Sequence, residues 1–213
     1  MVRPDADKIG GQWRVEVDET YVGGRTRGEG RGVHHSVLVA CAVETRPVKL
    51  THSKKAETKR KNHRLQAGRI RLMVLPDRTA ESCAGFVERS VSPGTTVVTD
   101  GWIGYADLNA KGYTHDPMVM SGSAEANEEH LPMVHIVFSN LKSWLTGTHH
   151  GVSPKHLQAY LNEFTFRFNR RFYPMASFNS VLGIGTRTTG PTYDELYEGE
   201  WVHPNTLGSQ AVG

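Results

Sequence analysis

Residues 134–171 constrain the fold most, because they hold two consecutive helical patterns. In the first pattern, apolar residues recur at the three- and four-residue spacing that lines one side of a helix. They are Val134, Val137, Phe138, Leu141, Trp144 and Leu145. His135 and Lys142 lie outside this stripe and are seven positions apart, which at about 100° per residue turns both to within roughly 20° of one direction. We therefore expect a histidine and a lysine to share one edge of a helix whose other side is buried.

The second helical pattern follows almost at once. Ser153 is the expected N-cap and Pro154 the expected first helical residue, each at the position that its side chain favours. The predicted buried stripe consists of Leu157, Tyr160, Leu161, Phe164 and Phe168. Arginines crowd the C-terminal end, namely Arg167, Arg170 and Arg171. They complement the helix dipole or bind phosphate, and the pattern alone leaves both readings open.

The N-terminal part of the chain predicts a β-hairpin. Residues 13–22 alternate apolar and polar side chains, as a half-buried strand does. The glycine-rich residues 23–32 are typical of a turn, and residues 35–44 form a strand too apolar to be exposed on both faces.

Three further strands and two helices are expected before residue 121. They are a strand over 69–76, a helix over 80–91 capped by Asp77 or Thr79, a strand over 95–100, a short helix over 106–110 and a strand near 117–120. A polar connection over 121–127 then leads to the two terminal helices. This order predicts an α/β fold with a mixed five-stranded sheet flanked by helices.

Length and composition predict one domain with a tail. Of the 213 residues, we assign 1–12 to a lead-in, 13–172 to the domain and 173–213 to an irregular tail with a possible helical turn at 193–197. The two cysteines, Cys41 and Cys83, lie in apolar or helical patterns and predict neither a disulfide framework nor a cysteine-rich zinc site. No long apolar run or signal peptide is present, so we expect a cytoplasmic protein without a membrane partner.

The net charge of +3 is unevenly distributed. Residues 45–71 contain ten Lys or Arg and one Glu, a formal charge of +9, which leaves −6 for the rest of the chain. This basic insertion, with Lys59, Arg60 and Lys61 at its centre, is either a solvated loop or a surface that binds a nucleic-acid backbone.

Two aspartates are the first candidates for chemistry. Asp18 lies inside the first strand and Asp100 ends the fourth, so the two meet if these strands are neighbours. Paired carboxylates suit Mg²⁺, which binds protein and phosphate oxygens together, and two such ions promote phosphodiester displacement. Aspartates beside glycine are also ordinary turn residues. His135 would add a third ligand, although a histidine near a helix start and a solvated Lys142 are equally ordinary features.

Three motifs resemble a known family. DETYVGGR around Asp18, VVTDGWIGY around Asp100 and SNLKSWLTGTHHGVSPKHLQAYLNEFTFRFNRR over 139–171 look like bacterial insertion-sequence transposases of the ISXO type. The similarity extends from about Trp13 to Tyr197. It implies a DDE-type catalytic domain with an RNase H-like fold, in which two Asp and a third residue, Glu, Asn or His, are followed by a lysine.

The resemblance implies a role for each candidate residue. Asp18, Asp100 and His135 become metal ligands, and Lys142 becomes the residue that contacts DNA near the reacting phosphate. Imidazole suits softer metals than Mg²⁺, so His135 is expected to bind Mn²⁺, to act through a water, or to serve as an acid or base. Glu128, Glu129 and Glu163 are the alternative carboxylates.

We therefore expect a nucleoid-associated DNA transposase that uses Mg²⁺ or Mn²⁺, cleaves transposon ends, joins them to target DNA and works as a homo-oligomer on DNA. Lys142, Arg167, Arg170, Arg171 and the basic insertion would bind the DNA. The family's N-terminal zinc ribbon and helix-turn-helix are expected to be missing, since no CxxC occurs. Two alternatives stay open: an inactive, truncated remnant that binds DNA or an intact transposase, and an RNase H-like nuclease.

Overall fold

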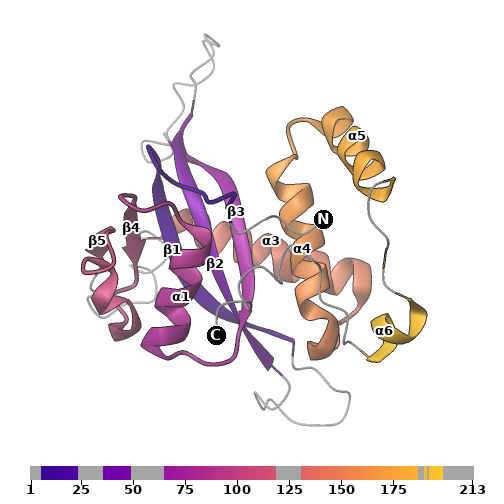
Figure 1. Cartoon of the computed structure of the whole chain (residues 1–213), viewed down its shortest axis with the longest axis horizontal. Coiled ribbons are helices and arrows are strands. Elements are labelled where there is room, and N and C mark those ends of the chain that lie inside the picture. Colours follow the sequence, from indigo (N-terminus) through magenta and orange to yellow (C-terminus); the bar gives the residue numbers. More distant parts are fainter. Residues whose placement is uncertain are drawn as a thin grey trace.

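Strand β1 (Arg14–Gly23) is the centre of the sheet in this computed structural model, whose described residues are 6–23, 36–48, 65–118, 131–186, 190 and 192–198. It pairs antiparallel with β2 (Ser36–Pro47) and parallel with β4 (Thr96–Thr99). The outer strands are β3 (Leu65–Leu75) and β5 (Thr114–Pro117), which give the order β3-β2-β1-β4-β5 (Figure 1). The fold is therefore the predicted α/β, RNase H-like mixed sheet of five strands.

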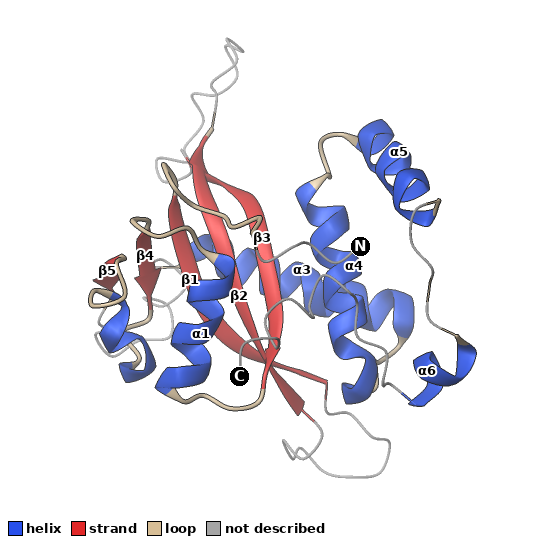
Figure 2. Cartoon of the chain, viewed as in Figure 1, coloured by secondary structure: helices blue, strands red, loops and turns tan. Residues whose placement is uncertain are grey.

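The alternation of side chains along the strands builds a core on each face of this sheet. On one face, α1 (Ala80–Ser90) and the 3₁₀ helix η1 (Ile103–Leu108) cover Val15 and Val17. On the other, α3 (Pro132–His149) and α4 (Leu157–Asn169) cover Val22 and Val98 (Figure 2). Because successive residues of β1 point to opposite faces, its polar side chains are also divided between the two helical layers.

Helix α1 begins where capping residues are available. The Thr79 side chain accepts a hydrogen bond from the Ser82 N–H at 3.3 Å, and Asp77 Oδ1 accepts from the Thr79 N–H at 3.0 Å. Glu81 lies in the first turn, where the helix dipole favours an acid. Both predicted capping residues therefore take part in starting this helix.

Helices α3 and α4 pack against each other through aromatic rings. Between centroids, the Trp144 indole of α3 lies 5.6 Å from the Phe164 ring of α4, and the His149 ring of α3 lies 4.6 Å from the Tyr160 ring of α4. A 3₁₀ turn, η2 (Pro154–His156), joins the helices. Ser153 and Pro154, predicted to start the second helix, start this turn, and α4 itself begins at Leu157 with His156 as its N-cap. Most buried residues of both helices come from the predicted stripes, with Trp144, Tyr160 and Phe168 partly buried beside them. Three residues outside the stripes are buried as well, namely Met133, Thr165 and Phe166.

Polar side chains of α4 also cover the free edge of β3. Asn169 accepts from the Ile70 N–H at 2.7 Å and donates to the Ile70 carbonyl at 3.1 Å. Gln158 accepts from the Val74 N–H at 2.9 Å. An edge strand exposes unpaired backbone groups that otherwise attract another strand. Helix α4 satisfies several of them and so fixes its own position against the sheet.

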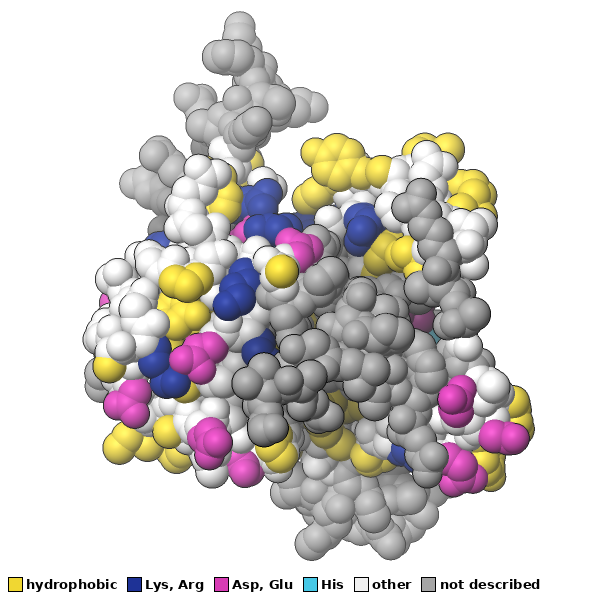
Figure 3. Space-filling view, in the orientation of Figure 1, with side chains coloured by type: hydrophobic (Ala, Val, Ile, Leu, Met, Phe, Trp, Pro, Cys, Tyr) yellow, Lys and Arg dark blue, Asp and Glu magenta, His cyan; other side chains and the backbone are white. Residues whose placement is uncertain are grey.

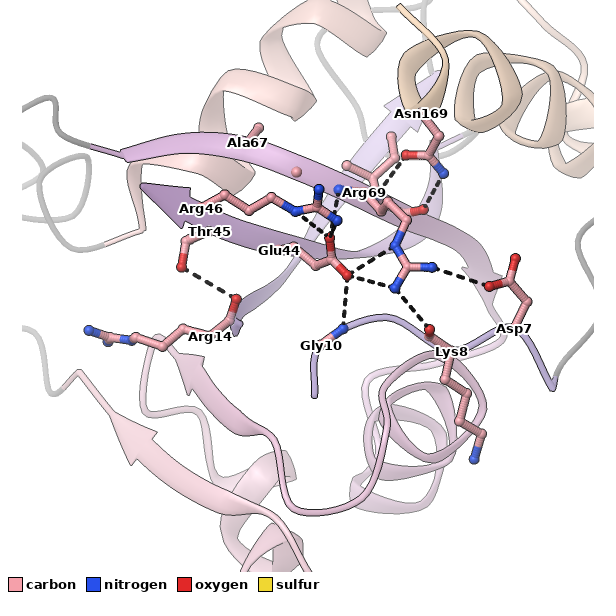
Figure 4. Close-up of polar contacts among 12 residues, drawn as sticks. Asp7, Lys8, Gly10, Arg14, Glu44, Thr45, Arg46, Ala67, Arg69 and Asn169 are labelled. Atoms are coloured by element: carbon pink, nitrogen blue, oxygen red, sulfur yellow. Dashed lines mark hydrogen bonds and ion pairs between the residues drawn. The ribbon is translucent and has the colours of Figure 1, made fainter. Parts of the chain in front are cut away.

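A buried carboxylate joins the N-terminal segment to β2 and β3 (Figure 4). Glu44 is fully buried and accepts hydrogen bonds from the Gly10 N–H at 3.0 Å and from Arg69 Nη2 at 2.9 Å. Arg46 Nε donates to it at 2.9 Å. Burial raises the pKa of Glu44, but the hydrogen bonds from Arg69, Gly10 and Arg46 outweigh burial and lower it below the ordinary value.

Several boundaries differ from the sequence prediction. The short helix lies at Ile103–Leu108 rather than 106–110, and β5 lies at Thr114–Pro117 rather than near 117–120. Both ends of the basic insertion belong to strands, since β2 runs to Pro47 and β3 starts at Leu65. Hydrogen bonding to a neighbouring strand extends β2 and β3 beyond their apolar pattern. The glycine-rich turn, the centre of the basic insertion and the polar connection lie outside the described residues.

The C-terminal part differs more. Instead of an irregular tail, α5 (Pro174–Gly185) follows α4. The later helix α6 (Tyr193–Glu198) confirms the helical turn predicted at 193–197. Pro174 at the first helical position favours the start of α5, whereas its glycines obscured the helix in the sequence. Apolar side chains gather on its surface, with Met175, Phe178, Val181 and Leu182 exposed (Figure 3).

Cys41 and Cys83 are both buried and free of disulfides, as predicted. Among the helices that the structure describes, none has the length and apolar character needed to cross a bilayer.

Replacing Glu44 with Gln should lower the free energy of unfolding by about 3 kcal/mol, because it removes the buried negative charge that pairs with Arg46 and Arg69. Arg69 retains its pair with Asp7 at 3.2 Å. Urea unfolding followed by circular dichroism measures the change. Glu88→Gln is the matched control: Glu88 pairs with Lys111 at 2.8 Å on the surface, and exposed pairs contribute only about 0–1 kcal/mol. Equal losses in both variants would contradict the role assigned to Glu44.

Candidate catalytic site

The parallel pairing of β1 with β4 brings the two candidate aspartates together. Val15 is opposite Val97 and Glu16 is opposite Val98. Continuing this register for two residues sets Asp18 beside Asp100. Because side chains alternate along a strand, Asp18 projects from the same face of β1 as Glu16, the face covered by α3.

Glu16 fixes the start of α3 over this face. Its Oε2 accepts hydrogen bonds from the Met133 N–H at 2.8 Å and the Val134 N–H at 2.9 Å. These N–H groups belong to the first turn, where N–H groups have no hydrogen-bond acceptor within the helix and the helix dipole is positive. Burial raises the pKa of Glu16 to about 7, although the two backbone hydrogen bonds lower it. His135 comes next in the helix and is half-buried.

Lys142 reaches from α3 back to β1. Its Nζ donates to Thr20 Oγ1 at 2.7 Å, and Thr20 lies two residues after Asp18 on the same face. Lys142 also lines a hollow of about 420 Å³ with Tyr21 and His150. The lysine therefore places a positive charge near the aspartates and beside an open space.

The protein disfavours the ionised form of Asp18, whose pKa is raised. Burial raises the pKa of Asp18 to about 6; the hydrogen bond from the Glu19 N–H lowers it, the charge of Asp100 raises it, and Arg78 and Lys142 lower it. Asp18, Asp100 and Lys142 thus interact electrostatically within one site. Two nearby carboxylates of which one is buried attract cations, because a cation offsets their repulsion and lost hydration.

Two further charged residues join the site. Arg78 Nε donates to Glu19 Oε2 at 2.9 Å, and Arg78 Nη2 lies 3.6 Å from Asp100 Oδ2. The Glu19 side chain is only 1% exposed, and burial raises its pKa to about 7 even though Arg78 lowers it. Sequence reasoning missed Arg78, Glu19 and Glu16. Strand alternation could have placed Glu16 beside Asp18, but no sequence pattern links Arg78, from a loop, to Asp100.

The oxygen donors of Asp18 and Asp100 fit a divalent ion such as Mg²⁺, which retains water and takes phosphate oxygens as its other ligands. His135 is on the expected helix, one turn or less from the residues bound by Glu16. Across the described ranges, however, no three His, Cys, Asp or Glu side chains form a group able to hold a metal ion. A third ligand therefore stays a prediction. Glu128 and Glu129 lie outside the described residues, and Glu163 pairs with Arg167 at 3.1 Å.

The predicted DNA-binding arginines lie at the C-terminal end of α4 and just after it, and Arg167 and Arg171 face β3. Arg167 and Arg171 line a groove of about 810 Å³ between β3, α3 and α4. Arg171 donates to the carbonyl of Phe168 at 2.8 Å and stacks on two rings, and Arg170 lies 4.0 Å from the Phe166 ring centroid. Lys59, Arg60 and Lys61 are outside the described residues. DNA binding by these six residues stays a prediction.

Comparison with known proteins identifies one family. The model of the ISXO2-like transposase domain matches residues 8–169. Neither the curated proteins nor the solved structures contain a match. The matched range contains every strand of the sheet, both aspartates, Lys142 and the residues that surround Glu44.

Replacing Asp18 with Asn should stabilise the metal-free protein more at pH 8 than at pH 4. The pKa of Asp18 is raised by folding, so its favourable contribution is present below about pH 4 and is lost as the pH rises through about 6. The advantage of the variant should grow by about 3 kcal/mol across this window, measured by urea unfolding with a chelator present. Asp107→Asn, on the exposed surface of η1, is the control. An advantage independent of pH would contradict the assignment.

Proposed function

The chain belongs to the ISXO2-like transposase family, and from this premise we propose that its domain cleaves DNA phosphodiesters at transposon ends and joins the freed ends to target DNA. Membership of a transposase family implies that the partner is DNA. The finer proposal concerns which residues perform the reaction. It is carried by one observation, the position of Asp18 beside Asp100 with Lys142 reaching to the same face of β1.

The two aspartates are the proposed ligands of Mg²⁺ or Mn²⁺. Bound divalent ions activate the attacking oxygen and stabilise the leaving oxygen of a phosphodiester. The protein's part is to hold the carboxylates together. The raised pKa of Asp18, caused mainly by burial and in smaller part by the charge of Asp100, supports this proposal, because a bound cation offsets both effects.

Lys142 is proposed to bind a phosphate next to the reacting one. Its ammonium is anchored by Thr20 at 2.7 Å, which leaves further donors for DNA, and the hollow beside it is open to solvent. His135 lies nearer the start of the same helix and offers a ring nitrogen, either as a ligand for Mn²⁺ or as a group that exchanges a proton near neutral pH. Phosphate contacts imply that affinity falls steeply with salt concentration.

Asp100→Asn should abolish cleavage and joining while leaving DNA binding intact, since the substitution removes a ligand charge without changing shape. Even changes outside the ligand set cost about 10–100-fold in metal-site activity, so a larger loss is expected. The assay incubates labelled DNA, taken from the sequences flanking the gene, with Mg²⁺ or Mn²⁺ and resolves the products on a gel. Asp107→Asn again serves as the control.

The product pattern separates this function from its alternatives. Joined products that depend on Asp100 support a transposase. Cleavage without joining would indicate a nuclease, and DNA binding without cleavage in either metal would indicate an inactive remnant. A DNA affinity that does not change between low and high salt would contradict the proposed phosphate contacts.

Replacing His135 tests its role directly. If the imidazole is a ligand, His135→Glu should retain cleavage and shift the preference from Mn²⁺ towards Mg²⁺, because carboxylate oxygen is the harder donor. His135→Ala should lower the rate by about 10-fold or more with both metals. The measurement is the ratio of cleavage rates in the two metals. Full activity of the Ala variant would exclude His135 from the reaction.

A further inference from the structure

Arg78 takes no part in the chemistry proposed above, yet it lies against one of the two carboxylates. It belongs to the loop between β3 and α1. Its Nε donates to Glu19 at 2.9 Å, and its Nη2 lies 3.6 Å from Asp100 Oδ2. One guanidinium therefore bridges the residue after Asp18 to Asp100 itself, across the end of β4.

Glu19 gives this guanidinium a rigid anchor. Its side chain is on the α1 face of the sheet, where Tyr105 Oη donates a hydrogen bond to it and Cys83 Sγ lies at 3.8 Å. Tyr105 and Cys83 are themselves buried. The Glu19 carboxylate cannot move without disturbing the core. It therefore fixes the Nε edge of the Arg78 guanidinium, while Nη2 is directed at Asp100.

Trp102 holds the guanidinium from a second direction. The Arg78 guanidinium carbon is 4.6 Å from the centroid of the indole, whose Nε1–H donates to the Arg78 carbonyl at 3.4 Å. The Trp102 backbone N–H donates to Asp100 Oδ1 at 3.0 Å. At Gly104 an added Cβ would lie 2.8 Å from this indole, so only glycine leaves room for it. Asp100 Oδ1 therefore contacts Trp102 and Asp100 Oδ2 faces Arg78, and these two residues pack against each other.

We infer that Arg78 is a positioning residue, which holds the Asp100 carboxylate in the orientation that binds the divalent ion. The inference rests on the proposed function. A guanidinium so close to a metal site also repels the ion, so two effects oppose each other. Removing Arg78 should weaken metal binding if it positions Asp100, and should strengthen metal binding if it serves only as a counter-charge.

The test measures the affinity for Mn²⁺ alone, from the electron paramagnetic resonance signal of the free ion, in two variants of the full chain. Arg78→Met keeps a long apolar stem beside Trp102 and removes the charge. Arg78→Lys keeps the charge and removes the planar fork that serves Glu19 and Asp100 together. Both should raise the Kd for Mn²⁺ by about 10-fold or more. Arg89→Met, exposed on α1, should leave it unchanged.

Two results would overturn the positioning role of Arg78. Tighter Mn²⁺ binding by Arg78→Met together with wild-type affinity in Arg78→Lys would overturn the positioning role in favour of a counter-charge. Unchanged affinity in both variants would overturn it as well. Circular dichroism checks folding, and if the Met variant does not fold, the Lys variant decides alone.

The same experiment keeps this inference separate from the proposed function. If the wild-type protein cuts no DNA but both Arg78 variants bind Mn²⁺ more weakly than it does, the positioning role stands and the transposase reaction is overturned. If the wild-type protein cuts DNA but both Arg78 variants bind Mn²⁺ as tightly as it does, the transposase reaction stands and the positioning role is overturned. A wild-type protein that binds no Mn²⁺ would overturn both.

Discussion

The hydrogen bonds between Glu16 and the first turn of α3 determine how the two halves of the candidate site meet. The carboxylate is buried, and it accepts from the Met133 and Val134 N–H groups at 2.8 and 2.9 Å. A buried carboxylate needs such partners, and the first turn of a helix needs acceptors. Each therefore satisfies the other. Since Asp18 follows Glu16 on one face of β1, and His135 and Lys142 follow Val134 on α3, one contact sets their relative positions.

The surrounding structure makes that contact rigid. Asn169 and Gln158 bind the backbone of the outer strand β3, so α4 cannot slide along the sheet, and Trp144 packs α3 against α4. On the opposite face, Glu44 gathers Gly10 and two arginines. The candidate site of this ISXO2-like transposase domain thus lies between layers that are each fixed by buried polar groups.

The electrostatics of the site follow from burial more than from any single ion pair. Asp18, Glu16 and Glu19 all have raised pKa values because the sheet and its helices remove water from them. Lys142 and Arg78 offset part of this cost for Asp18. Such an arrangement favours a bound cation, because a cation offsets the lost hydration and the repulsion between the carboxylates.

Local patterns determined much of this protein: the strands, the buried stripes of α3 and α4, the cap at Thr79 and the candidates Asp18, Asp100 and Lys142 all follow from side-chain spacing and known motifs. Spacing reports which way a residue faces within its own element, so it placed His135 and Lys142 on one edge. Only the tertiary structure decided which residues of other elements face that edge. The pairing of β1 with β4, the cap formed by Glu16 and the bridge from Arg78 to Asp100 join residues far apart in the chain, and such contacts depend on how the layers pack.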